Sequence, residues 1–253
     1  MPDKWDPLLQ TDSAKPKYRT IADRPHHNER MGPLRIGHRG AAGHAPGNTL
    51  LSIEAALRIG VDLVEIDVQQ TADDNLIVLH DRDLHPATTG RGPVSASSLD
   101  KIRTLRTVPG NLPIPSLNEV IACVNGRAGL MIEFKVAGIA RQTLGILRNA
   151  RFAGAVYYAS FIHEELLAVR ALDATAPTIA LLEGTPVNMA AFALDAKATH
   201  AGLSIHSLSR RFVEQLHKAD IQVFVWTVDE PEQIEFAKGC GVDGLISNYP
   251  DRL

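Results

Sequence analysis

The chain has 253 residues, of which 45% are hydrophobic and 22% charged, and this ordinary globular composition allows one large domain or two small ones. The formal net charge of −3 at pH 7 provides no basic excess, so we expect no nucleic-acid partner. No stretch approaches about 18 consecutive apolar residues, so no transmembrane segment is expected.

Residues 1–31 are polar and include several basic side chains, but they contain no apolar stretch long enough for a signal-peptide core. We expect them to form a flexible N-terminal tail, and we expect the protein to be cytoplasmic. The two cysteines, Cys123 and Cys240, have no CxxC partner or neighbouring metal ligand. A disulfide framework or a zinc site is therefore not expected.

From Pro33 onward, short apolar runs alternate with stretches of helical periodicity. The runs predict strands near residues 34–37, 63–68, 130–134, 155–159, 178–182, 201–205, 222–226 and 244–247. Helices are predicted at residues 49–59, 117–124, 139–149, 164–172, 211–219 and 231–238. Such alternation implies parallel strands with crossover helices. Eight strands predict a single (β/α)8 TIM barrel over residues 32–253, with a doubly wound sheet as the alternative.

One connection is longer than a barrel needs. About 35 residues, rich in glycine, proline and threonine, separate His80 from Leu117, and a connection that long within a compact domain usually serves a function. We expect a small insertion after the second strand region, at about residues 82–115. It is expected to lie beside the mouth of the barrel and to form no separate domain.

Acidic side chains lie within two of the predicted strands. Glu65 and Asp67 are two positions apart and therefore point to the same side of their strand, as Glu133 and Lys135 do on another. They fall at the carboxyl ends of these strands, where barrel enzymes hold catalytic groups. Three converging acids would repel one another without a cation, and oxygen ligands favour Mg²⁺ or Ca²⁺. The alternative is that they form ion pairs with Lys135 or Arg39.

Two histidines occupy similar strand ends. His38 closes the first strand and opens a glycine-rich turn, and His80 closes a further short strand. With Arg39 available to hold a phosphate oxygen, the two resemble an acid–base pair around a phosphoryl centre. Asp81 either orients His80 or bonds the backbone of its turn. His44 is expected on a solvent-exposed loop.

Taken together, these segments resemble the glycerophosphodiester phosphodiesterase family. The resemblance covers roughly residues 33–250, and although each segment is short, the ordered set is highly specific. The matching segments are His38-Arg39-Gly40, Ala45-Pro46-Gly47-Asn48-Thr49, Val64-Glu65-Ile66-Asp67-Val68-Gln69, His80-Asp81 with Leu84 and Thr88-Thr89, Ile114-Pro115-Ser116-Leu117, Glu133-Phe134-Lys135, Val225-Trp226-Thr227-Val228 and Gly241-Val242-Asp243-Gly244-Leu245-Ile246.

The resemblance implies roles for eight residues. The implied metal ligands are Glu65, Asp67 and Glu133, the acid–base pair is His38 and His80, and the substrate contacts are Arg39, Lys135 and Trp226.

The resemblance also implies the reaction. A glycerophosphodiester is hydrolysed to sn-glycerol 3-phosphate and an alcohol, with one divalent cation, Mg²⁺ or Ca²⁺, as cofactor. The glycerol 2-hydroxyl attacks phosphorus, a cyclic phosphate forms, and water opens it while the two histidines exchange proton-transfer roles. The sequence does not say which histidine acts first as the base.

Three positions depart from the family pattern. Gly47 stands where the family usually has glutamate, Pro86 where a basic residue is common, and Asp229 where asparagine is common. These departures affect the expected substrate and not the expected fold.

Three alternatives to the implied function remain: a lysophospholipase D that acts on a lipid, a non-catalytic phosphodiester-binding barrel, and a protein with an iron site formed by His38, His80 and Asp67.

Overall fold

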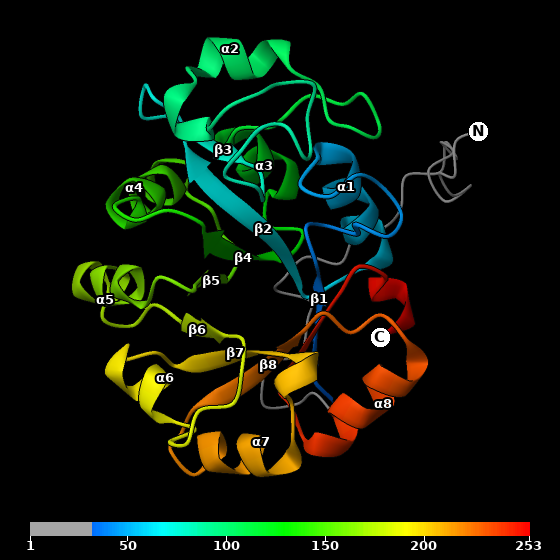
Figure 1. Ribbon diagram of the computed structural model, residues 1–253, viewed down its shortest axis with the longest axis vertical. Helices are drawn as coiled ribbons and strands as arrows, with labels where there is room; N and C mark the ends of the chain where they lie inside the picture. Colours follow the sequence, from blue (N-terminus) through cyan, green and yellow to red (C-terminus); the bar gives the residue numbers. More distant parts are fainter. Residues whose placement is uncertain (1–31) are drawn as a thin grey trace.

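The computed structural model describes residues 32–253, and the predicted tail, residues 1–31, lies outside the described residues. Eight parallel strands form a closed barrel, because β1 pairs with both β2 and β9. The predicted TIM barrel is therefore confirmed, and the doubly wound sheet is excluded (Figure 1). The strands are β1 (Leu34–Gly37), β2 (Leu63–Gln70), β4 (Gly129–Phe134), β5 (Val156–Ser160), β6 (Thr178–Leu182), β7 (His200–Ser204), β8 (Gln222–Trp226) and β9 (Gly244–Ser247).

Helices surround the strands in the predicted alternation (Figure 1). They are α1 (Leu50–Ile59), α3 (Leu117–Val124), α4 (Ala140–Asn149), α5 (His163–Leu172), α6 (Ala191–Asp195), α7 (Arg210–His217) and α8 (Pro231–Cys240). All but α6 were predicted to within two residues at each end. The five residues of α6 span little more than one turn, too few to produce a periodic pattern.

Alternation along each strand separates the interior of the barrel from the layer beneath the helices. On β2, Val64, Ile66 and Val68 are fully buried against the helices, while Leu63 faces the interior. The interior cluster consists of Leu34, Ile36, Leu63, Met131, Tyr157, Ala159, Ile179, Leu181, Phe224 and Ile246. Toward the carboxyl ends of the strands, the inward-facing positions are polar instead of apolar. The charged side chains Glu65, Asp67 and Glu133 therefore lie at the carboxyl end of the barrel.

The first helix begins directly after a loop at the barrel mouth. Thr49 is its N-cap, and its side chain accepts a hydrogen bond from the backbone N–H of Ser52. Gly60 ends the helix with φ of 81°, a left-handed conformation that glycine adopts without strain. Because Thr49 supplies the cap, the side chain of Asn48 is available to face the barrel.

The chain between β2 and α3 adds structure outside the barrel. Strand β3 (Leu76–Val78) pairs antiparallel with the carboxyl end of β2. It is followed by the insertion, which contains a 3₁₀ turn, η4 (Val94–Ala96), and helix α2 (Leu99–Thr104), at the top of Figure 1. A separate apolar cluster joins β3 to the insertion and consists of Ile77, Leu79, Leu84, Val94, Ile102 and Ile114. At the start of the insertion, Arg82 donates to the backbone carbonyl of Lys135 at 3.0 Å, which connects the insertion to the end of β4.

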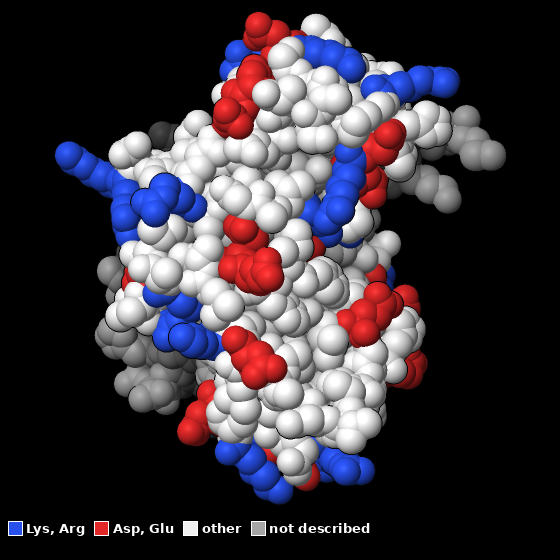
Figure 2. Space-filling model, turned by 60° about the vertical axis from the view of Figure 1, so that its left-hand side comes forward, with Lys and Arg blue, Asp and Glu red and all other residues white. Residues whose placement is uncertain are grey.

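Within residues 32–253, no helix is long and apolar enough to cross a membrane. On the face drawn in Figure 2, acidic and basic side chains are interspersed, and neither sign forms a continuous surface.

Candidate active site

The barrel mouth contains a cavity of about 120 Å³ at the carboxyl ends of the strands. Its apolar lining includes Met131, Leu181 and Ile246. All the predicted site residues except Asp67 also line it, and these are His38, Arg39, Glu65, His80, Glu133, Lys135 and Trp226. Asp67 lies directly beside the cavity, because it belongs to the same group of acids as Glu65 and Glu133.

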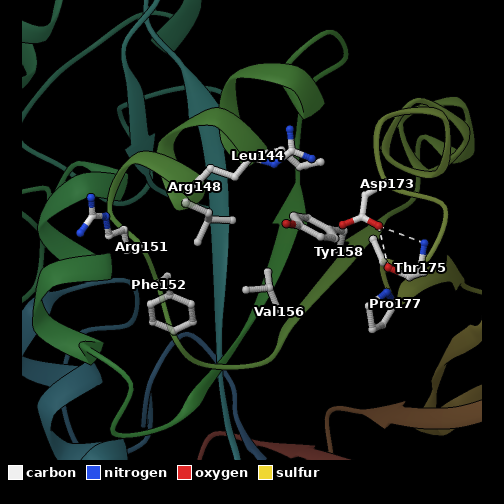
Figure 3. Close-up of a pocket in the computed structure, with 11 residues that line it drawn as sticks. Leu144, Arg148, Arg151, Phe152, Val156, Tyr158, Asp173, Thr175 and Pro177 are labelled. Carbon is white, nitrogen blue, oxygen red and sulfur yellow. Dashed lines mark hydrogen bonds between the residues drawn. The ribbon is translucent and has the colours of Figure 1, made fainter.

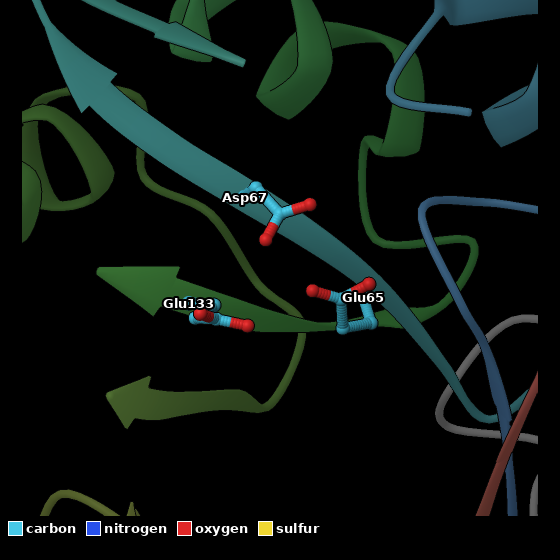
Figure 4. A group of neighbouring side chains, drawn as sticks. All are labelled: Glu65, Asp67 and Glu133. Carbon is cyan, nitrogen blue, oxygen red and sulfur yellow. The ribbon is translucent and has the colours of Figure 1, made fainter. Parts of the chain in front are cut away.

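The three acids come from two neighbouring strands. Glu65 and Asp67 lie on β2 and Glu133 on β4, where it is the register partner of Asp67. Their carboxyl groups turn toward one another (Figure 4), and each offers an oxygen within 4.8 Å of the others. Glu65 and Asp67 are buried, at 3% and 1% exposure, so water cannot offset their charge.

Burial and mutual repulsion change how these acids titrate. Burial, followed by the charges of Asp67 and Glu133, raises the pKa of Glu65 well above its ordinary value. Burial and Asp67 likewise raise the pKa of Glu133 to about 7. Burial also raises the pKa of Asp67, but Arg39 and Lys135 outweigh it and leave this pKa below its ordinary value. Ionising one of these acids therefore makes it harder to ionise the others, and a further positive charge would lower that cost.

Two cationic side chains contact the acids, as the ion-pair interpretation of the sequence expected. Lys135 Nζ lies 2.6 Å from Glu133 Oε1 and 3.4 Å from Asp67 Oδ1. Arg39 Nε lies 3.3 Å from Asp67 Oδ2. The backbone N–H of Arg39 donates to Glu65 Oε2 at 2.7 Å, which holds the turn after β1. Three carboxyl groups thus face two cationic side chains, which could not neutralise all three if every acid were ionised.

An oxygen-donor metal site fits this group. Of the described residues, these three acids are the ones placed to hold a metal ion together, and neither predicted catalytic histidine belongs to the group. An all-carboxylate donor set suits a hard cation. The iron alternative would need His38 and His80 beside Asp67, and the described residues do not group them in this way. The positive charge of a divalent cation would also lower the pKa values of Glu65 and Glu133, which burial and the neighbouring acids raise.

His38 and His80 both line the cavity, and each contacts a different side chain. His38 Nδ1 lies 2.7 Å from Asn248 Oδ1, and burial together with Arg39 lowers the pKa of His38 to about 4. His80 is 37% exposed, and its Nδ1 lies 2.9 Å from Asp81 Oδ1. Of the two roles considered for Asp81, the structure therefore shows the one that orients His80.

Aromatic side chains form one wall of the cavity. Trp226 packs edge-on against Phe161, with ring centroids 5.8 Å apart, and Phe161 is 46% exposed. Trp226 Nε1 is buried and makes no hydrogen bond to any described residue.

Some contacts at the mouth were not predicted. Asn48 was named only as part of a matching segment, yet its Nδ2 donates to Asp67 Oδ2 at 2.8 Å and its Oδ1 accepts from the backbone N–H of Asp67. Asn248 was missed altogether. The signal that could have revealed it is its position directly after β9, where barrel loops carry site residues.

The loop after β1 contains two further findings. A Cβ atom added to Gly47 would lie 3.1 Å from Arg39 Cβ and 3.3 Å from Ala42 Cβ, so any side chain at this position would press against Arg39. His44 was expected to be exposed, and this was wrong: it is 8% exposed, its Nε2 lies 2.6 Å from Asp251 Oδ1, and its ring packs edge-on against Tyr249. The C-terminal segment folds back over the loop and buries it.

A second cavity, of about 310 Å³, is larger but contains none of the predicted site residues. It lies between α4 with the loop after it and the segment that follows α5 (Figure 3), with Leu144, Phe152 and Tyr158 on its walls and Arg148 and Asp173 among its charged residues. The smaller cavity is the candidate active site, because the acids, cations and histidines converge there and not on the larger one.

The fold and the site together define a TIM-barrel protein with three neighbouring carboxyl groups at its mouth that could hold a metal ion. Residues 38–252 match the model of the glycerophosphoryl diester phosphodiesterase family. The chain belongs to this family and is a phosphodiesterase.

Similar proteins cover nearly the same length. A glycerophosphodiester phosphodiesterase of Bacillus subtilis is 30% identical over 246 residues, which are 86% of this chain and 84% of that protein. One from Caldanaerobacter subterraneus is 30% identical over 236 residues, covering 88% and 97%.

Solved structures agree with the barrel. A glycerophosphodiester phosphodiesterase from Agrobacterium tumefaciens has a TM-score of 0.75 at 25% identity and covers 88% of this chain and 98% of its own. A phosphodiesterase from Oleispira antarctica, solved with the product sn-glycerol-3-phosphate, has a TM-score of 0.81 at 24% identity, with 87% and 94% covered.

Proposed function

We propose that the protein hydrolyses glycerophosphodiesters to sn-glycerol 3-phosphate and an alcohol. The observation that carries this proposal is the convergence of two histidines, three acids and two cations on one cavity of about 120 Å³. The curated relatives named as glycerophosphodiester phosphodiesterases, at 30% identity over most of the chain, support the choice of substrate class.

In this proposal Glu65, Asp67 and Glu133 hold one divalent cation, Mg²⁺ or Ca²⁺. Their oxygens are hard ligands, and their positions within 4.8 Å of one another suit a shared ion. When bound, the cation supplies positive charge for the phosphoryl oxygens and lowers the cost of ionising the acids.

The two histidines move the protons. One removes the proton from the glycerol 2-hydroxyl as its oxygen bonds to phosphorus, and the other protonates the alcohol oxygen as its bond to phosphorus breaks. The product of this step is a five-membered cyclic phosphate. Water then attacks phosphorus with the proton roles reversed, and the ring opens to glycerol 3-phosphate.

Arg39 and Lys135 bind the phosphate oxygens, and Trp226 lines the part of the cavity beside them. Arg39 and Lys135 already lie at the acid group through contacts of 3.3 and 2.6 Å, so little reorganisation is needed to meet an anion there. The aromatic pair of Trp226 and Phe161 offers an apolar surface to the carbon atoms of the substrate.

The test is release of glycerol 3-phosphate from a panel of glycerophosphodiesters with different head groups, assayed with Mg²⁺, with Ca²⁺ and with a chelator. A lysophospholipid in the same panel tests the lipid alternative, which the polar composition of the insertion disfavours. Activity confined to the lysophospholipid would replace the proposed substrate. Binding of these compounds without product from any of them would favour the non-catalytic barrel.

A substrate analogue methylated on its 2-hydroxyl is expected to give no product. Without that hydroxyl, no internal nucleophile is available and the cyclic phosphate cannot form. The measurement is glycerol 3-phosphate release against the unmethylated substrate, with competition assays to establish that the analogue still binds. Normal turnover of the analogue would rule out internal attack and require direct attack by water.

Cation affinity is expected to rise with pH between about 6 and 8. Glu133, whose pKa is raised to about 7, keeps its proton below that value, and a proton on a ligand competes with the metal. Each unit of pH below this pKa should therefore weaken binding by up to about tenfold. Calorimetric titration of the metal-free protein with Ca²⁺ at several pH values measures this. An affinity independent of pH over the range would contradict the assignment of Glu133 as a ligand.

A further inference from the structure

Two residues with no assigned role form a hydrogen-bonded chain that ends on His38. Asn248, directly after β9, places Oδ1 2.7 Å from His38 Nδ1. The other end of the same amide, Nδ2, donates to Asp229 Oδ2 at 2.7 Å. We propose that Asp229 and Asn248 are positioning residues that hold His38 in one tautomer, with the hydrogen on Nδ1 and Nε2 left for proton transfer. This rests on the proposed role of His38 as an acid–base group.

The orientation of the Asn248 amide follows from its surroundings. An amide side chain presents an acceptor at one end and a donor at the other, whereas an ionised carboxylate only accepts. Turning the amide around would place Oδ1 against Asp229 Oδ2 at hydrogen-bond distance, with two acceptors facing each other. Oδ1 of Asn248 must therefore face His38, and the hydrogen of that contact must lie on His38 Nδ1.

The carboxylate of Asp229 is itself held in place. Its Oδ1 accepts from Ser247 Oγ at 2.9 Å and from the backbone N–H of Asn248 at 2.8 Å. Its backbone carbonyl accepts from Arg252 Nη1 at 2.9 Å. Asp229 follows β8, and the other residues belong to β9 and the segment after it, so the chain joins adjacent strands of the barrel to the end of β1.

The two histidines thus differ in what holds them. His80 contacts the carboxylate of Asp81 directly, at 2.9 Å, whereas a neutral amide separates His38 from the carboxylate of Asp229. An amide oxygen fixes the ring and its tautomer without placing a full negative charge on it. The arrangement orients His38 while leaving Nε2 as the ring nitrogen for the reacting oxygen.

Three variants test the chain by kinetics. Asn248→Leu removes the acceptor with little change in volume, and Asp229→Asn lets the amide of Asn248 turn around. Each is expected to lower kcat by about 10²-fold while KM changes less than about threefold, since orientation of the ring is lost and substrate contacts are kept. The swap Asp229→Asn with Asn248→Asp keeps every donor opposite an acceptor and should recover kcat to within about tenfold of the unchanged protein.

A spectroscopic measurement tests the tautomer without any substrate. Nitrogen NMR of histidine-labelled protein distinguishes a ring nitrogen that carries hydrogen from one that does not, and the spectrum of a His38→Gln variant identifies the His38 signals among the ten histidines. In the unchanged protein at a pH where His38 is neutral, we expect hydrogen on Nδ1. In Asn248→Leu both tautomers should be populated.

The control is Asn75→Ala, because the exposed side chain of Asn75 lies in a turn of the loop after β2 and donates to the backbone carbonyl of Asp73 at 3.0 Å. It should leave kcat and the His38 signals unchanged, and thermal unfolding of every variant checks that it is folded. Hydrogen on Nε2 in the unchanged protein, full activity in Asn248→Leu, or a swap no better than its two single variants would each overturn the proposal. If the unchanged protein releases no glycerol 3-phosphate, the proposed function fails, and the NMR result still decides the tautomer.

Discussion

Replacing His38 or His80 with glutamine is expected to lower kcat by about 10³-fold, or about 4 kcal/mol in activation free energy. Each histidine would transfer a proton in both steps of the proposed reaction, once as base and once as acid, and glutamine can do neither. KM should change little, since the phosphate contacts of Arg39 and Lys135 remain. Steady-state kinetics of glycerol 3-phosphate release measures both values.

The matched control for these variants is His217→Gln. His217 is a half-exposed histidine paired with Asp243 at 2.8 Å, and it lies on α7, not at the cavity. This substitution should leave kcat within about twofold of the value for the unchanged protein. A His38 or His80 variant that stays as active as the control would remove that residue from the acid–base pair.

The second large effect is expected at the acid group. Glu133→Gln keeps an oxygen for Lys135 to bond but removes one ionised ligand, so cation affinity should fall by at least about tenfold. The activity of this variant at low cation concentration should fall with its affinity. A chelator should lower the activity of the unchanged protein by more than about 10²-fold until Mg²⁺ or Ca²⁺ is restored. Calorimetric titration and assays over a range of cation concentrations measure the two effects.

Glu235→Gln provides the comparison for this experiment. Glu235 is on the surface helix α8, its side chain is 77% exposed, and its removal changes the net charge by the same amount as Glu133→Gln. Equal cation affinity in the two variants would show that loss of charge alone, and not loss of a ligand, explains the result.

The residues that could be predicted from the sequence lie on regular strands. Glu65, Asp67 and Glu133 are brought together by the two-residue period of a strand and the parallel register of β2 with β4, and both are properties that a pattern of residues reveals. His38 and Lys135 also follow inward-facing rows. The positions of these residues therefore agree with the sequence, while their chemical roles and the cytoplasmic location stay predictions.

The contacts that were missed depend on loops whose path no periodicity describes. Asn248 reaches His38 across 210 positions of the chain, through the closure of β9 against β1. His44 is buried because Tyr249 and Asp251 fold over it, which its own segment cannot indicate. The length of the insertion could likewise be predicted, but its helix α2 could not, because six residues are too few to show a helical period.

Lys135, which bonds Glu133 within the acid group, has a consequence for how the protein matures. A zinc finger folds only when its metal ion is bound. In this protein the ammonium group of Lys135 already offsets part of the repulsion between the acids. We therefore expect the chain to fold without a cation, and the cation of the proposed reaction to bind the folded protein.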